Sequence, residues 1–102
     1  MKVLKDILEE SKEYYLDLKK RIEKRIQNLP KGSIKERRIG GGVYYYLQYR
    51  EGKKVIHKYL GKNKPEELIK QIEERKKLLN ELKKVEEALE LISRTEKRKR
   101  NE

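Results

Sequence analysis

The sequence contains no cysteine, no tryptophan and no phenylalanine, and it has a single histidine. The absence of cysteine excludes disulfides and thiolate metal sites, and makes a cytoplasmic location the default expectation. One histidine excludes His-rich metal clusters and paired-histidine chemistry, so we expect neither a metal nor another cofactor. The chain lacks an apolar run near the roughly 20 residues of a membrane span, and its first residues lack the apolar core of a signal peptide. We therefore expect no membrane association.

Apolar residues are also scarce, at 34% of the 102 residues against 46% charged ones. A chain of this length holds one small domain, and its Leu, Ile and Val residues must form narrow stripes instead of a thick core. The abundance of Lys, Glu and Ile beside the missing residue types is typical of hyperthermophile proteins.

Positive charge is concentrated in the middle of the chain. The formal net charge is +11, and residues 31–64 alone hold ten bases and two acids. Residues 94–102 add five bases against two acids, whereas residues 65–93 hold six bases and eight acids. Segments as basic as the middle one typically bind polyanions.

Three regions of different periodicity predict an α+β fold. Residues 1–29 are expected to form an amphipathic helix, because apolar and small polar side chains recur at alternating steps of four and three up to the Pro30–Gly32 breaker. Residues 33–62 are rich in strand formers and predict a three-stranded antiparallel sheet. Its expected strands are Ser33–Ile39, Val43–Arg50 and Lys54–Leu60, and the alternative is that Gly40–Gly42 is a flexible loop between two elements.

The last region, residues 63–93, is predicted to be a second amphipathic helix. Asn63 with Pro65 and Glu66 forms a capping-box pattern at its start. The stripe of this helix is interrupted by Arg75, as that of the first helix is by Ser11 and Arg25. Residues 94–102 carry no apolar stripe and are expected to be a frayed or disordered basic tail.

The two helices are too long for the sheet to cover. A helix of 26 residues spans about 39 Å, and a strand of seven residues spans about 23 Å. The uncovered stripes are therefore expected to pair as a coiled-coil-like hairpin or dimer. We favour a homodimer, and a monomeric helical hairpin is the alternative.

Alternation along residues 43–50 separates two faces of the sheet. Val43, Tyr45, Leu47 and Tyr49 form the more apolar face, which we expect to contact a helix, and the intervening residues face outward. A three-residue loop at Gly52 would place Val55 opposite Leu47, with Lys54 and Lys58 on the outward face. A two-residue Glu51-Gly52 loop would instead bring Ile56 inward, with both lysines on the helix side. We favour the first register because it buries no lysine.

The outward face has the composition of a nucleic-acid-binding surface. Lysine and arginine suit phosphate or guanine, glutamine suits adenine, and tyrosine suits stacking or phosphate contact. The alternative is that a tyrosine-rich strand with lysines at its edges is ordinary strand composition. The predicted binding residues, with the basic tail as an arm that grips the nucleic-acid backbone, are Lys35, Arg37, Tyr44, Tyr46, Gln48, Arg50, Lys53, Lys54, Lys58, Lys97, Arg98, Lys99 and Arg100.

No catalytic site is expected. His57 has no partner at triad or metal-ligand spacing, and the tyrosines lack an identifiable activating set. We therefore expect a non-enzymatic protein without a small-molecule substrate, which binds DNA in preference to RNA. The alternative is a protein–protein interaction module that acts through its helices.

The middle of the chain resembles a family of small prokaryotic domains of unknown function that occur in archaeal and bacterial genomes and mobile elements. The residues that carry the resemblance are Gly32-Ser33-Ile34, Tyr44 to Lys53, Tyr59 to Lys62 and Pro65 to Leu68. The same order is similar to the arm-type DNA-binding domain of tyrosine integrases, a three-stranded sheet packed on a helix that enters the major groove. The resemblance covers about Gly32 to Leu79 and implies a regulator or architectural factor of a mobile element or virus.

Overall fold

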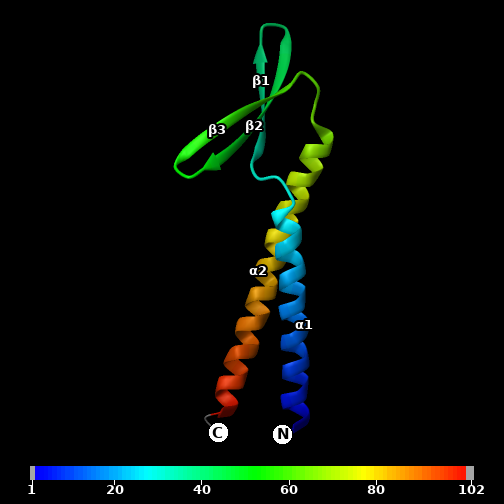
Figure 1. Cartoon of the computed structure of the whole chain (residues 1–102), viewed down its shortest axis with the longest axis vertical. Helices are drawn as coiled ribbons and strands as arrows, with labels where there is room; N and C mark the ends of the chain where they lie inside the picture. The colour runs from blue at the N-terminus through cyan, green and yellow to red at the C-terminus, as the bar shows by residue number, and fades with distance from the viewer. Residues whose placement is uncertain (1, 101–102) are drawn as a thin grey trace. The chain divides into compact units, whose positions relative to one another are not determined.

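The computed structural model describes the backbone of residues 2–100 and the side chains of residues 2–98. Its elements follow the order that the sequence predicts, so the α+β fold is confirmed (Figure 1). The chain divides into two compact units, one formed by residues 1–28 and 77–102 and the other by residues 29–76. The elements are α1 (Lys2–Gln27), β1 (Ser33–Ile39), β2 (Gly42–Glu51), β3 (Lys54–Gly61) and α2 (Glu66–Arg100), the last of which contributes to both units.

The sheet is an antiparallel meander of order β1-β2-β3. Both of its turns contain two residues, because Ile39 pairs with Gly42 and Glu51 pairs with Lys54. Each turn begins with a glycine of positive φ, 62° at Gly40 and 61° at Gly52. Glycine in the first central position is what a two-residue hairpin turn compatible with strand twist requires. The triple glycine is therefore a tight reversal between strands and not a flexible loop.

The alignment of β3 on β2 differs from the register that we favoured. Lys58, and not Val55, lies opposite Leu47. Lys54 and Lys58 consequently share the face of Leu47, as in the alternative register, although the turn is formed by Gly52 and Lys53. The preference was wrong because it equated the helix side of the sheet with burial, whereas both lysines are exposed there. A long lysine stem can lie along apolar surface with its ammonium in water.

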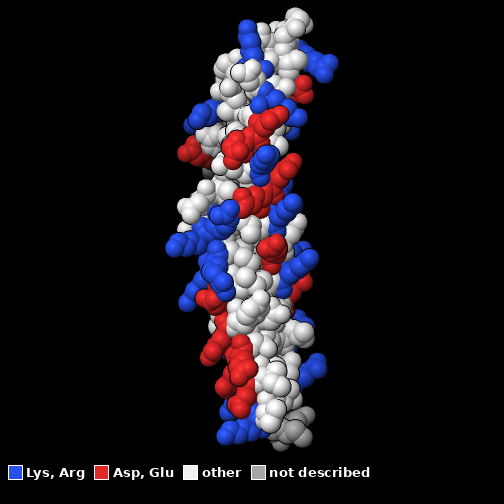
Figure 2. Space-filling view, turned by 90° about the vertical axis from the view of Figure 1, so that its right-hand side faces the viewer, with Lys and Arg blue, Asp and Glu red and all other residues white. Residues whose placement is uncertain are grey.

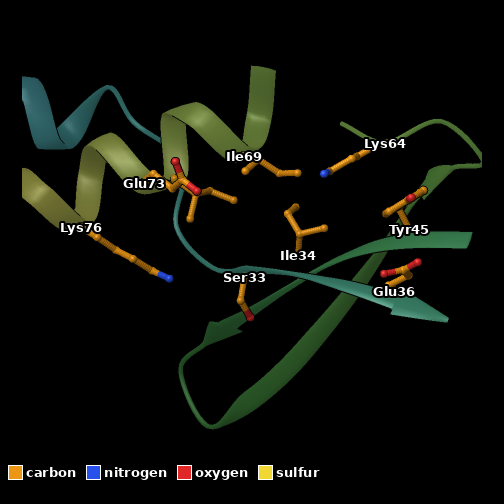
Figure 3. Close-up of a pocket in the computed structure, with 9 residues that line it drawn as sticks. Ser33, Ile34, Glu36, Tyr45, Lys64, Ile69, Glu73 and Lys76 are labelled. Atoms are coloured by element: carbon orange, nitrogen blue, oxygen red, sulfur yellow. The ribbon is translucent and has the colours of Figure 1, made fainter. Parts of the chain in front are cut away.

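One face of the sheet packs against the start of α2. Ile34 of β1 and Tyr45 of β2 line a cavity of about 300 Å³ together with Ile69 and Ile72 of the helix. Figure 3 shows Ile34 and Tyr45 projecting from their strands on the side where Ile69 approaches. Ile72 is 5% exposed and is the buried centre of this unit. The face that Leu47 shares with Ile34 is therefore the helix side, as alternation predicted.

In the other unit, α1 runs antiparallel to the later part of α2, and both termini lie at the same end (Figure 1). Ile22 of α1 is buried, as are Val85 and Ile92 of α2. The ammonium of Lys12 lies 3.6 Å from a carboxylate oxygen of Glu96, so an ion pair joins the two helices. The buried Ile22, Val85 and Ile92 belong to the predicted apolar stripes of their helices.

The helix α2 departs from the prediction at both ends. The amide of Ile69 donates to the carbonyl of Pro65 at 3.0 Å, so Pro65 takes the N-cap position in place of Asn63. At the other end, residues 94–100 continue the helix and are not frayed. Arg94 pairs with Glu90 one turn earlier at 2.5 Å, and such i,i+4 pairs extend a helix that has lost its apolar stripe. Residues 101–102 of the predicted tail, like Met1, lie outside the described residues.

Neither helix, over its described length, has an apolar stretch that would cross a membrane. Charged residues of both signs are spread over both units in Figure 2.

A substitution at Gly32 tests how closely the chain approaches β2. Gly32 has a φ of 111°, and a Cβ there would lie 2.5 Å from the carbonyl oxygen of Gln48. We expect Gly32→Ala to lower the free energy of unfolding by at least about 1–3 kcal/mol, the usual size of such strain. Gly41→Ala is the control, because Gly41 has no positive φ and its Cβ would meet nothing within 4 Å. Equal denaturation midpoints for the two variants would contradict the close approach.

Candidate nucleic-acid interface

The face of the sheet turned away from α2, called the outer face below, combines side chains of all three strands. Lys35 lies opposite Tyr46, and Arg37 lies opposite Tyr44, so the predicted cations of β1 do join the tyrosines. On β3, Tyr59 lies opposite Tyr46. By pairing and alternation, the outer face comprises Ser33, Lys35, Arg37, Ile39, Tyr44, Tyr46, Gln48, Arg50, Val55, His57 and Tyr59.

Three tyrosines form a cluster at the centre of this face. The ring centroid of Tyr59 lies 5.4 Å from that of Tyr46 and 6.4 Å from that of Tyr44, with tilted planes. Such distances and tilts are favourable for aromatic pairs. Tyr59 remains 53% exposed, whereas the other two are half-buried. The cluster is therefore held together by its own contacts and still presents ring surface to solvent.

Two cations lie on the tyrosine cluster. The guanidinium of Arg37 is 5.0 Å from the ring centroid of Tyr46, and the ammonium of Lys62 is 5.9 Å from that of Tyr44. Exposed cation–π contacts of this kind contribute about 0.5–1 kcal/mol each. A guanidinium stacked on a ring keeps its N–H edge available for the bidentate contacts that arginine makes with phosphate. The aromatic rings thus position the charges that a polyanion would meet.

The acidic side chains of the sheet are confined to one of its two faces. The two acids of residues 31–64 both lie on the helix side, where Glu36 pairs with Tyr45 and Glu51 with Lys54. Glu36 also approaches Arg38 at 4.0 Å on that side. Among the described strand residues, the outer face therefore carries lysine and arginine without a carboxylate. This arrangement leaves its positive charge uncompensated.

Only some of the other predicted binding residues lie on this face. Gln48 and Arg50 belong to it, and Lys53 lies in the β2–β3 turn. The prediction that Lys54 and Lys58 share the face of Tyr44 and Tyr46 is wrong. The remaining predicted residues belong to the helical unit: Lys97 and Arg98 are exposed on α2, and the side chains of Lys99 and Arg100 lie outside the described residues.

Sequence reasoning does not find the β3 residues of this face. The favoured register, which has Val55 on the helix side, places His57 and Tyr59 there by alternation, whereas all three lie on the outer face. Lys62, which contacts the tyrosine cluster, follows the last predicted strand and is not among the predicted binding residues. Gly52 carried the missing signal: glycine at the first central position favours a two-residue turn. That turn reverses the facing of every residue of β3 relative to the register that we favoured.

The cavity between the sheet and α2 has a different character. Its lining includes the carboxylates Glu36 and Glu73 and the ammonium-bearing side chains Lys64 and Lys76, so its charges balance (Figure 3). Among the described residues, no group of three potential ligands is placed to hold a metal ion. The uncompensated charge and the exposed rings make the outer face the stronger candidate.

Neighbouring residues of β3 give a direct test of these faces. Ile56 is half-buried on the helix side, and Val55 is exposed on the outer face. We expect Ile56→Ala to lower the free energy of unfolding by about 1–3 kcal/mol through lost packing, and Val55→Ala by no more than about 0.5 kcal/mol. Urea denaturation measures both. The reverse order would indicate the register with Val55 on the helix side.

No curated protein and no solved structure gives a significant match to the chain. A family described as a domain of unknown function, DUF6788, matches residues 5–71. This match extends from α1 through the whole sheet into the first turns of α2. The chain therefore belongs to the DUF6788 family of uncharacterised domains.

Proposed function

We propose that this chain is a non-enzymatic nucleic-acid-binding protein that binds double-stranded DNA through the outer face of its sheet. The observation that carries the proposal is the composition of that face: Lys35 and Arg37 lie beside a tyrosine cluster, Arg50 lies further along β2, and both acids of the segment lie on the other side. Phosphate attraction supplies most of the affinity of such surfaces.

The arrangement of the face suits contacts of two kinds. Arg37 and Lys35 extend from the exposed strand β1, where they would reach phosphates on either side of a groove. Gln48 lies on the central strand, and an amide there has the donor and acceptor pair that reads adenine. A narrow β-ribbon fits the major groove. We propose the docking mode that the resemblance of this segment's sequence motifs to the arm-type domain of tyrosine integrases implies.

The proposed biological setting rests on the same resemblance of sequence motifs. We propose a regulator or architectural factor of a mobile element or virus, which acts in the cytoplasm. A second candidate is the protein–protein interaction module, supported by the apolar side chains that the helical unit leaves exposed, among them Ile7 and Leu91. A chain that binds no nucleic acid would favour this second function.

Two charge-matched double variants test the proposal. Lys35→Glu with Arg37→Glu alters the outer face, and Lys54→Glu with Lys58→Glu makes the same change in net charge on the opposite face. We expect the first pair to weaken binding to random duplex DNA more than tenfold and to lower the salt slope by about 2, because two phosphate contacts are lost. The second pair should have a clearly smaller effect.

Fluorescence anisotropy over a series of salt concentrations, on variants with unchanged circular dichroism, gives these values. Equal weakening by the two pairs would show that overall charge, and not the outer face, determines affinity. Unchanged affinity in both would overturn the proposal. A parallel titration with duplex RNA distinguishes DNA from RNA as the preferred ligand.

The C-terminal basic residues are expected to add affinity without specificity. Removal of residues 97–102 deletes four basic side chains and one acidic one. We expect weaker binding by the same factor for all duplex sequences and a smaller salt slope, because contacts with the backbone carry no sequence information. Competition between duplexes of different sequence measures the factor. A changed order of preference would show that this segment reads bases.

A further inference from the structure

We infer that the helical unit associates with a second copy of this chain through one flank of its helix pair. The flank, called the apolar flank below, is formed by Val3, Ile7 and Tyr14 of α1 and by Ala88, Leu91 and Thr95 of α2. The inference concerns a surface in the unit that does not contain the sheet, and it does not depend on nucleic-acid binding.

The α1 part of the flank is a second apolar stripe beside the one that meets α2. Val3, Ile7 and Tyr14 follow one another at steps of four and seven, so they lie along one line of the helix. At about 100° per residue, this line is roughly a quarter turn before that of Tyr15 and Ile22, which are half-buried and buried. Ile7 is 52% exposed and Tyr14 is 58% exposed.

The α2 part lies on the same flank of the pair. Ala88 and Thr95 precede the line of the buried Val85 and Ile92 by about a sixth of a turn, and Leu91 precedes it by slightly more than a quarter turn. Because the helices are antiparallel, offsets in the same sense fall on the same flank. Leu91 is 64% exposed. Figure 2 shows uncharged surface along the right of the lower half and acidic side chains grouped to its left.

The chain buries few of its apolar side chains. Within the described part of the chain, four hydrophobic side chains are buried and none is fully so. Apolar packing of a second copy against the flank would therefore enlarge the small core between α1 and α2.

The charges around the flank favour a second copy. Exposed Glu10 and Glu87 border it together with exposed Lys84 and Arg98. A symmetric dimer brings the same patch of two molecules together, so a border with both signs lets acids of one copy meet bases of the other. A helix face that binds an anionic membrane surface would instead be bordered mainly by lysine and arginine.

Sedimentation equilibrium of the full chain at micromolar concentration tests the inference. We expect twice the mass of 12.4 kDa for the parent, and at least a hundredfold higher dissociation constant for Ile7→Glu and for Leu91→Glu. Leu16→Glu is the matched control, since Leu16 is 41% exposed on the opposite flank of α1. It should leave the dimer intact. A parent that stays monomeric, or a control that dissociates as strongly as Ile7→Glu, would overturn the inference.

A second measurement covers the case in which a glutamate variant does not fold. The chain has no cysteine, so Leu91→Cys and Leu16→Cys each introduce a single thiol. We expect alkylation of the thiol at position 91 to slow severalfold as protein concentration rises, and that at position 16 to proceed at a constant rate. Concentration-independent rates at both positions would contradict a dimer through this flank.

Discussion

The turn formed by Gly52 and Lys53 determines which side chains of the sheet act together. Its two-residue length sets Glu51 against Lys54 and so fixes the alignment of β3 on β2 as far as Tyr46, beyond which the register shifts. One more residue in the turn would turn every side chain of β3 to the other face. Tyr59 would then leave the tyrosine cluster, and Lys58 would take up a place beside the tyrosines. The candidate interface therefore depends on one glycine whose φ is 61°.

The separation of charge in the sheet has an electrostatic consequence. Both faces contain cations, but on the helix side they share their surroundings with Glu36 and Glu51, and Arg38 approaches Glu36 at 4.0 Å. The fields of neighbouring opposite charges largely cancel at distances greater than the separation of the two charges. The outer face has no such cancellation among its described strand residues. Its field extends further into solvent and attracts polyanions from a distance.

The scarcity of apolar residues limits the size of the core in the helical unit. With 34% hydrophobic residues, the chain supports one narrow seam between α1 and α2, centred on Ile22, Val85 and Ile92. Each helix nevertheless keeps apolar side chains outside that seam. Helices of this length derive most of their stability from packing and little from intrinsic propensity. The seam and the exposed flank together give each helix the wide apolar surface that a helix inside a bundle needs.

The sequence by itself determined the type, order and approximate bounds of all five elements. The spacing of apolar residues, with a period of 3.6 in a helix and of 2 in a strand, is a local property of the sequence and does not depend on how the elements pack. Half of the outer face was also predictable, since alternation along β2 and the β1–β2 turn place Lys35, Arg37, Tyr44, Tyr46 and Gln48 together. The prediction for residues 94–100 was wrong because the absence of an apolar stripe does not prevent the helix from continuing.

Only the tertiary structure decided which β3 residues join that face. The two registers considered for β3 place the same residues in a strand, so local strand propensity does not distinguish them. The choice depends on which turn residue adopts a positive φ and on whether a lysine on the helix side can stay in water. Lys54 and Lys58 do stay exposed there, and sequence alternation alone cannot express this. The contact of Lys62 with Tyr44 likewise joins residues that are distant along the chain. Such proximity is set by the alignment of the strands in three dimensions.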